Sequence, residues 1–300
     1  MKRAPARRSS GAGAKHWVMG ARPRTLGAAV APVVAGTAVA FAEVREVSAG
    51  RALLALVVAL ALQVGVNYAN DYSDGVRGTD EVRAGPVRLT ASGLASPHAV
   101  RTAAALAMGV AAVAGLALAI IVTPWLVLVG VASIAAAVLY TGGPKPYGYS
   151  GLGELMVLVF FGFVATAGST FVQLEWIPAI ALWASVTIGL LACAILVTNN
   201  LRDIRGDAAV GKRTLAVRLG ESATRRLYVG CVVIAFLAIA PIAYEYPSAL
   251  LAYAAAPLVV LPTRRVLRAT SPPELVAALV GTARLELVTA VLLGLGLWLS

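Results

Sequence analysis

The sequence predicts an all-α polytopic membrane protein, and three observations carry that prediction. Of the 300 residues, 59% are hydrophobic and only 13% are charged. The mean hydropathy is +0.83. Soluble domains average about 45–50% apolar and about 25% charged residues. The apolar residues form long unbroken runs, which favour helices over the alternating strands of a β-barrel.

Nine apolar windows are each long enough, at about 20 residues, to cross about 30 Å of hydrocarbon as a helix. They cover residues 24–43, 51–70, 99–122, 124–141, 152–172, 177–198, 226–243, 247–263 and 281–299. Residues 1–15 are basic and lack an apolar core, so we expect a disordered cytoplasmic tail before a membrane domain at 16–300. Cys193 and Cys231 fall inside predicted spans, which indicates neither a disulfide framework nor a zinc site.

Positive charge predicts the orientation of these spans. The formal net charge is +11, and most of the 25 Lys and Arg residues lie in the first 24 residues or in alternate loops. Arg45 and Arg51 fall on the opposite side. This is the positive-inside pattern of an odd number of spans, with the N-terminus in the cytoplasm and the C-terminus outside. The charge distribution therefore indicates an inner (cytoplasmic) cell membrane and no nucleic-acid partner.

The second window ends in the motif NDYSDGVRGTD, which places three aspartates at the cytoplasmic edge of the membrane. Asn70 and Asp74 are four residues apart and share a helix face. Asp80 follows two glycines, so we expect it on a turn past the helix end. A solvated helix end is the simplest alternative for one such acid. However, a helix C-terminus disfavours carboxylates, and an ionisable group at a membrane edge is a functional candidate.

The sixth window ends in NNLRDIRGD, which repeats the arrangement of the first motif. Asn199, Asp203 and Asp207 are spaced by four and lie in one helical column. Two clusters of this kind on one side of the membrane are hard to explain as solvated helix ends. Carboxylate and amide oxygens suit Mg²⁺, which binds a few carboxylates and leaves positions for phosphate oxygens. The two motifs therefore predict metal clamps for a diphosphate.

Basic residues crowd the same two loops. Arg77, Arg205 and Lys212 are candidates for binding the diphosphate, because Lys and Arg beside Mg²⁺ neutralise phosphoryl charge. Arg83 and Arg88 are explained as well by the positive-inside rule. No glycine-rich phosphate loop of the soluble type is present in the sequence, so a soluble-type nucleotide site is not indicated.

These motifs resemble the UbiA superfamily of intramembrane aromatic prenyltransferases, over about residues 15–300. Within that superfamily, the stretches ARPRTLGAAVAPVVAGTA, GPVRLTASG and GKRTLAVRLG are similar to those of the 1,4-dihydroxy-2-naphthoate polyprenyltransferases. The resemblance implies nine helices around a central cavity. It also implies a cytoplasmic cap made by the loops after helices 2 and 6.

The resemblance also implies which residues hold Mg²⁺ and the diphosphate: Asn70, Asp74, Asp80, Asp203 and Asp207. Of these, Asp74, Asp203 and Asp207 are the expected catalytic residues. The spacing from Asp74 to Asp80 is longer by two residues than in the hydroxybenzoate enzymes of the superfamily. That difference leaves the individual roles of Asp71 and Asp80 open.

Further candidates for substrate binding come from two shorter stretches and from the second motif. Lys145 and Tyr140, in YTGGPKPYGY, could reach the cavity, although an interfacial aromatic explains Tyr140 equally well. Arg22 and its neighbour Arg24, in RPRT, are candidates for the carboxylate of an acidic acceptor, and membrane anchoring is the alternative. Asn199 completes the set expected to bind substrate.

The implied reaction transfers a polyprenyl group from an allylic diphosphate to 1,4-dihydroxy-2-naphthoate. Pyrophosphate and CO₂ leave, and demethylmenaquinol forms in menaquinone biosynthesis. Other aromatic acceptors, such as homogentisate, hydroxybenzoate or haem, are alternatives. A CDP-alcohol phosphotransferase would keep all its aspartates in one segment, and a cation-coupled transporter would place acids near the bilayer midplane. The expected partners are the two substrates and the lipid bilayer.

Overall fold

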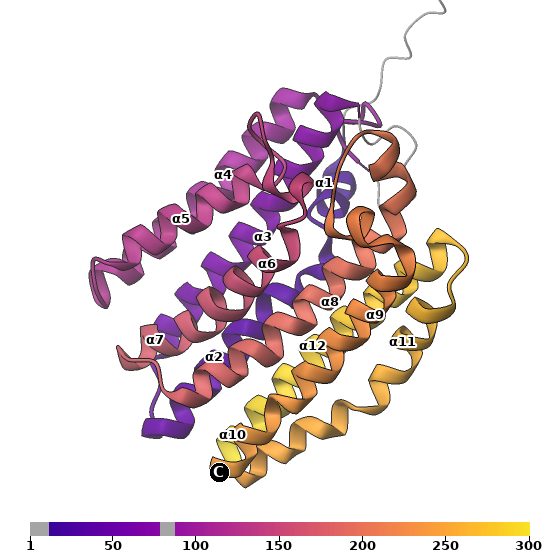
Figure 1. Ribbon diagram of the computed structural model, residues 1–300. Coiled ribbons are helices and arrows are strands. Elements are labelled where there is room, and N and C mark those ends of the chain that lie inside the picture. Colours follow the sequence, from indigo (N-terminus) through magenta and orange to yellow (C-terminus); the bar gives the residue numbers. More distant parts are fainter. Residues whose placement is uncertain (1–11, 79–87) are drawn as a thin grey trace, which may run out of the picture.

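The computed structural model describes residues 12–78 and 88–300, and these residues form a helical bundle (Figure 1). Its helices and helical turns, in chain order, are α1 (Ala14–Gly20), η1 (Pro23–Thr25), α2 (Gly27–Val44), α3 (Ala49–Arg77), α4 (Pro97–Ile121), α5 (Leu126–Leu139), η2 (Tyr147–Ser150), α6 (Gly153–Val157), η3 (Leu158–Ala167), α7 (Gly168–Leu174), α8 (Ala179–Ala209), α9 (Leu215–Leu237), α10 (Ile239–Glu245), η4 (Pro247–Ala255), α11 (Pro257–Arg268) and α12 (Pro272–Leu299). The predicted tail at 1–15 falls mostly outside the described residues and stays a prediction.

Helix length and composition confirm the nine predicted spans only in part. In the described residues, seven helices are long and apolar enough to cross a membrane, or eight if η4 and α11, which meet at 42°, count as one span. The window at 124–141 yields α5, which has only 14 residues. A helix of that length covers about 21 Å, short of the roughly 30 Å of hydrocarbon. The all-helical, multi-pass prediction is confirmed, and the number nine is not.

Local capping signals explain where several long helices begin. Ser48, Ser96 and Thr214 are the N-caps of α3, α4 and α9, and each side chain accepts a hydrogen bond from the backbone N–H three residues later. Helix α3 then continues past its apolar window until Gly78, whose φ of 69° ends it in the left-handed conformation. The first polar motif therefore begins inside the last turns of a long helix, which fixes its side chains.

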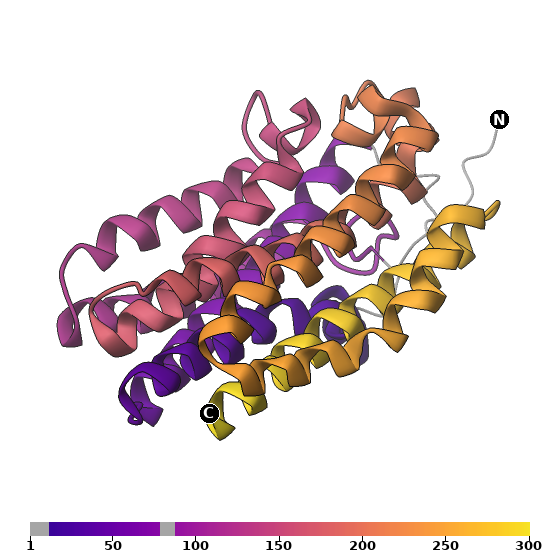
Figure 2. The ribbon, with the colours of Figure 1, turned by 60° about the horizontal axis from the view of Figure 1, so that its bottom comes forward.

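The helices pack around α2, α8 and α12, which contact one another in the middle of the bundle. Helices α4 and α5 lie along one side of this group and α11 lies along the opposite side (Figure 1). A view turned by 60° shows the same separation (Figure 2). Helix α3 pairs mainly with α4, and α8 pairs mainly with α9. The space between these two groups is where the cavity lies.

Glycine allows the π-helix η3 to pack tightly between α2 and α8. A Cβ atom at Gly36 of α2 would lie 2.2 Å from the carbonyl oxygen of Thr166, and one at Gly189 of α8 would lie 2.7 Å from the Cα of Gly162. Neither position tolerates a side chain without backbone movement. These contacts fix the wide turns of η3 in the cavity wall. Such π-helical turns are common at functional sites.

Candidate active site

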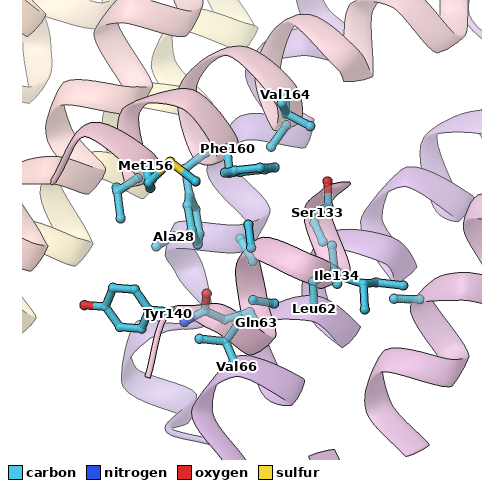
Figure 3. A pocket seen from close by; sticks show the side chains of 18 of the residues that line it. Ala28, Leu62, Gln63, Val66, Ser133, Ile134, Tyr140, Met156, Phe160 and Val164 are labelled. Atoms are coloured by element: carbon cyan, nitrogen blue, oxygen red, sulfur yellow. The ribbon is translucent and has the colours of Figure 1, made fainter. Parts of the chain in front are cut away.

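An elongated cavity of about 590 Å³ lies inside the bundle. Its walls come mainly from α2, α3, α4, α5, η3 and α8. Figure 3 shows Phe160 and Met156 on one side of this space, facing Gln63 and Val66 of α3. Toward the C-terminal ends of α3 and α8 the lining becomes polar, with Asn70, Asp74, Asn199, Asn200 and Lys212.

Asp74 is the centre of this polar end. Its side chain is buried, with 3% of the residue exposed. The Lys212 Nζ lies 3.0 Å from its Oδ1, the Tyr149 hydroxyl donates a hydrogen bond to the same oxygen, and the Arg88 Nη2 lies 3.7 Å from its Oδ2. A buried carboxylate without such partners would be strongly destabilising. Three segments far apart in the sequence therefore meet at this one group.

Lys212 connects the two predicted motifs. In addition to its contact with Asp74, its Nζ lies 3.8 Å from Oδ1 of Asp207, near the end of α8. Lys212 is buried and follows Gly211, which has a φ of 78° and turns the chain back after α8. The sequence prediction that both motifs face one site is consistent with this arrangement.

The other polar residues of the second motif form side-chain hydrogen bonds. Asp203 is buried, and its carboxylate accepts two hydrogen bonds from the Arg202 guanidinium, at 2.8 and 2.6 Å. The same guanidinium donates to Oδ1 of Asn199 at 2.8 Å. Asn200 lines the cavity and donates to Oε1 of Glu154 at 2.9 Å. The α8 motif is thus ordered by side-chain pairs before any substrate binds.

Asp71 has a structural role that the sequence left open. Its two carboxylate oxygens accept hydrogen bonds from the backbone N–H groups of Leu89, at 2.7 Å, and Thr90, at 2.9 Å. This contact holds the segment that begins at Arg88 against α3. Because Arg88 is the residue directly before Leu89, Asp71 positions the Arg88 guanidinium next to Asp74.

The segment from Tyr140 to Ser150 covers the polar end of the cavity and is attached to α3. Arg77 donates to the carbonyl oxygens of Thr141 and Gly143, both at 2.5 Å, and the Thr141 hydroxyl donates to Oδ1 of Asn70 at 2.8 Å. The Lys212 Nζ and the Arg77 guanidinium lie 4.5 and 5.4 Å from the centroid of the Tyr149 ring. Burial and the nearby Asp74 carboxylate raise the pKa of Tyr149, so its hydroxyl stays protonated and donates.

The structure brings some of the predicted site residues to the cavity wall but not all of them. Asp203, Asp207 and Arg77 lie outside the set of residues that line the cavity, although Asp207 and Arg77 contact side chains that do. Arg22 and Tyr140 line the cavity, in addition to the polar lining residues named above. Lys145 and Arg24 are exposed, and Arg205 is exposed and paired with Glu221 at 3.4 Å. Among the described residues, Lys145, Arg24 and Arg205 are likewise absent from the cavity wall. Helix geometry explains Arg205, which is two residues from Asp203 and so points to the other side of α8. Asp80 lies outside the described residues.

Sequence reasoning missed Tyr149 and left Arg88 open between phosphate binding and a membrane-orienting charge. Neither residue belongs to a motif with an obvious chemical pattern. The only signal for Tyr149 was its place in PYGY, a loop between two predicted spans on the motif side of the membrane. Gln63, inside an apolar window, was also missed. A lone glutamine in such a window was the available signal, since polar groups in membrane helices are costly.

The donor set fits a Mg²⁺–diphosphate complex better than a metal site made by protein alone. No three His, Cys, Asp or Glu side chains of residues 12–78 and 88–300 lie close enough to hold a metal ion. Mg²⁺ is usually bound by one or two carboxylates, with substrate phosphates and water in the other positions. Asp74 and Asp207, on either side of Lys212, match that pattern.

The sequence pattern of the UbiA prenyltransferase family matches residues 29–288. The chain belongs to this family. It is 50% identical to the 1,4-dihydroxy-2-naphthoate octaprenyltransferase of Mycobacterium tuberculosis over 275 residues, which cover 92% of this chain and 94% of that enzyme. It is 38% identical to the Escherichia coli enzyme of the same name, and the aligned residues cover 95% of each chain.

The fold is also that of solved UbiA proteins. A UbiA homolog from Archaeoglobus fulgidus bound to GPP and Mg²⁺ superposes with a TM-score of 0.64 at 12% identity, over 93% of this chain and 99% of that one. The apo structure of a UbiA homolog from Aeropyrum pernix gives a TM-score of 0.64 at 15% identity, over 94% and 96%. Membership of this family favours prenyl transfer over the phosphotransferase and transporter alternatives.

The hydroxyl of Tyr149 provides a first test of the site. We expect Tyr149→Phe to lower kcat/KM for the prenyl diphosphate by about tenfold, because Asp74 loses a charge-assisted hydrogen bond worth about 1.5 kcal/mol. Tyr228→Phe is the matched control, since its hydroxyl bonds Thr282 in a distant part of the core. Steady-state kinetics of the purified variants make the comparison. Equal effects of the two substitutions would assign Tyr149 a packing role only.

Proposed function

We propose that the chain is a Mg²⁺-dependent aromatic polyprenyltransferase. Its acceptor is 1,4-dihydroxy-2-naphthoate and its product is demethylmenaquinol, which places it in menaquinone biosynthesis. The observation that carries the proposal is the contact of Lys212 with both Asp74 and Asp207 at the polar end of an apolar cavity. The names of the relatives at 50% and 38% identity support the choice of acceptor.

The polar end of the cavity suits the diphosphate of the donor. Lys212 and Arg88 already lie beside Asp74, where they can neutralise phosphate oxygens. Asn70, Asp74, Asp203 and Asp207 are the residues that would hold Mg²⁺, with Asp80 as a further candidate. When bound, the metal supplies Lewis-acid stabilisation of the pyrophosphate leaving group. The basic side chains add to that stabilisation and orient the diphosphate.

The apolar walls suit the reaction that follows. The allylic C–O bond breaks, both of its electrons leave with pyrophosphate, and the allylic carbon becomes electrophilic. Side chains such as Val33, Phe160, Phe161 and Val164 line the cavity and exclude water, which would otherwise capture the cation. The same walls accept the hydrocarbon tail of the donor.

The acceptor ring then attacks the allylic carbon. In 1,4-dihydroxy-2-naphthoate the carboxyl-bearing carbon is ortho to a hydroxyl and is therefore electron-rich. When this carbon forms the new C–C bond, its bond to the carboxylate breaks, CO₂ leaves, and the released electron pair restores the aromatic ring. Arg22 lines the cavity and is our candidate for binding the carboxylate, and Tyr140 lines the cavity as well.

The orientation in the membrane belongs to the same proposal. The polar ends of α3 and α8, with the segment from Tyr140 to Ser150, form the cytoplasmic cap in an inner membrane. A reporter fused after Lys212 should then behave as cytoplasmic, and one fused after Ser300 as extracytoplasmic. Both reporters on one side of the membrane would contradict this orientation. The physical basis is the retention of Lys and Arg loops in the cytoplasm.

The aspartates of the two motifs give the test of metal dependence. Asp74→Asn and Asp203→Asn should each lower kcat by at least about 100-fold, because roughly 2.7 kcal/mol of transition-state stabilisation is lost. EDTA should abolish turnover and Mg²⁺ should restore it. Glu221→Gln makes the same chemical change on an exposed residue near the same end of the bundle and should stay near wild type. Near-normal rates in either aspartate variant would contradict the assignment of the two motifs.

The product tests the choice of acceptor. Incubation with a polyprenyl diphosphate and 1,4-dihydroxy-2-naphthoate labelled in its carboxyl group should release labelled CO₂ in equal amount to prenylated product. The product mass should lack the carboxyl group. Mass spectrometry and trapped CO₂ provide the measurement. A product that keeps its carboxylate, or a preference for 4-hydroxybenzoate, would contradict the proposed acceptor without contradicting membership of the family.

A further inference from the structure

A stripe of polar side chains runs along the cavity side of α3. The α3 polar stripe consists of Gln63, Asn67, Asn70 and Asp74, all of which line the cavity. Their spacings of four, three and four residues place them on one face of the helix. Three of them have partners: Asn67 donates to the carbonyl oxygen of Ala21 at 2.9 Å, Asn70 accepts from Thr141, and Asp74 contacts Lys212.

Gln63 differs from the other members of the stripe. Its Oε1 is buried and has no hydrogen-bond donor within the part of the chain that the structure describes. Around it the cavity wall is made of apolar residues, including Ala59, Leu62 and Val66. An amide oxygen buried without a partner costs about 1–3 kcal/mol, and a leucine or methionine would avoid that cost. An unsatisfied amide in such a wall indicates a ligand that brings its own donor.

The chemistry of the two substrates of the proposed function decides which one can supply that donor. A polyprenyl tail is hydrocarbon, and the oxygens of a diphosphate bound to metal and bases act as acceptors. A dihydroxylated aromatic acid carries O–H donors on its ring. Of the two substrates, only the aromatic acceptor can therefore pair with this amide oxygen.

The position of Gln63 agrees with that choice. The contact between Asn67 and Ala21 places the neighbouring Arg22, which also lines the cavity, near the level of Asn67. Gln63 is one helical turn farther from the diphosphate end, about 6 Å along α3. In Figure 3 Gln63 lies on α3 near Tyr140, across the cavity from Phe160. Arg22 and Gln63 thus offer an anion-binding group and a hydroxyl acceptor on the wall of the same cavity.

We propose that Gln63 binds the acceptor by accepting a hydrogen bond from a ring hydroxyl through its Oε1. This inference rests on the proposed function. The hydrogen bond fixes the ring against the donor end of the cavity, so that the reacting carbon faces the allylic carbon. It also leaves more electron density on the hydroxyl oxygen and on the ring carbon ortho to it. Gln63 is therefore a determinant of acceptor specificity and takes no part in binding the diphosphate.

Kinetics with modified enzyme and modified acceptor test this role together. In Gln63→Met, kcat/KM for the acceptor should fall by about 10- to 100-fold while KM for the prenyl diphosphate stays within twofold of wild type. Leu106→Met, on the outward face of α4 with 67% of the residue exposed, is the control for a new methionine. The two mono-O-methyl ethers of the acceptor remove one donor each. With one of the ethers, the activity of the wild type should fall below its activity with the unmodified acceptor. The same ether should cause no further fall in Gln63→Met, because the two changes remove the same interaction.

Each contrary result has a defined meaning. Acceptor kcat/KM within twofold of wild type in Gln63→Met, an equal rise in donor KM, or additive losses with both ethers would overturn the role of Gln63. If Gln63→Met does not elute as folded protein, Gln63→Leu replaces it in the same cycle. If the wild type uses a hydroxylated aromatic acid other than 1,4-dihydroxy-2-naphthoate, the proposed function fails in its acceptor. The cycle with that acid and its O-methyl form then decides the role of Gln63 separately.

Discussion

The ion pair between Asp74 and Lys212 is the interaction on which the site depends. A carboxylate that is almost completely buried at the end of a membrane helix is tolerated only with compensating charge and hydrogen bonds. Lys212, Tyr149 and Arg88 supply that compensation from three separate segments of the chain. Because an unpaired Asp74 would be strongly unfavourable, the fold is stabilised when the ends of α3 and α8 and the segment from Tyr140 to Ser150 lie together around it.

In the proposed reaction, Lys212 and Arg88 would exchange the Asp74 carboxylate for phosphate oxygens. Lys212 and Arg88 contact Asp74 through flexible side chains, whereas Asp71 and Arg77 attach the surrounding backbone with bonds to N–H and C=O groups. In the proposed reaction, these backbone attachments would keep the frame in place while the side chains turn from carboxylate to phosphate oxygens. Because the frame is set in advance, little reorganisation is needed when charge develops on the leaving group.

Packing differs between the two sides of the bundle, and the difference creates the cavity. Around α2, α8 and α12 the contacts involve small buried residues such as Ala31, Ala35 and Gly189, which let helix backbones approach closely. Helices α4 and α5 instead expose large apolar side chains, including Val113, Ile120 and Leu128, as expected for surfaces that face lipid. The space left between α3 and α8 is lined mainly by apolar groups, with polar groups at one end and along one stripe of α3. A hydrocarbon tail and a polar ring can therefore occupy the same cavity at different positions.

The sequence by itself determined the helical class, most helix positions, the two polar motifs and the family resemblance. These are local properties, because hydrophobic length, i to i+4 spacing and composition are readable along a single segment. Only the tertiary structure separated Asp71, which binds backbone, from Asp74, which contacts cations, although both stand in one motif. It also showed that Arg205 points outward and that Tyr149 and Gln63 line the site. Which way a side chain points, and whether its hydrogen bonds are satisfied, depends on groups distant in sequence. Asp74 and Lys212, for example, are separated by 138 positions, and no local pattern records such a contact.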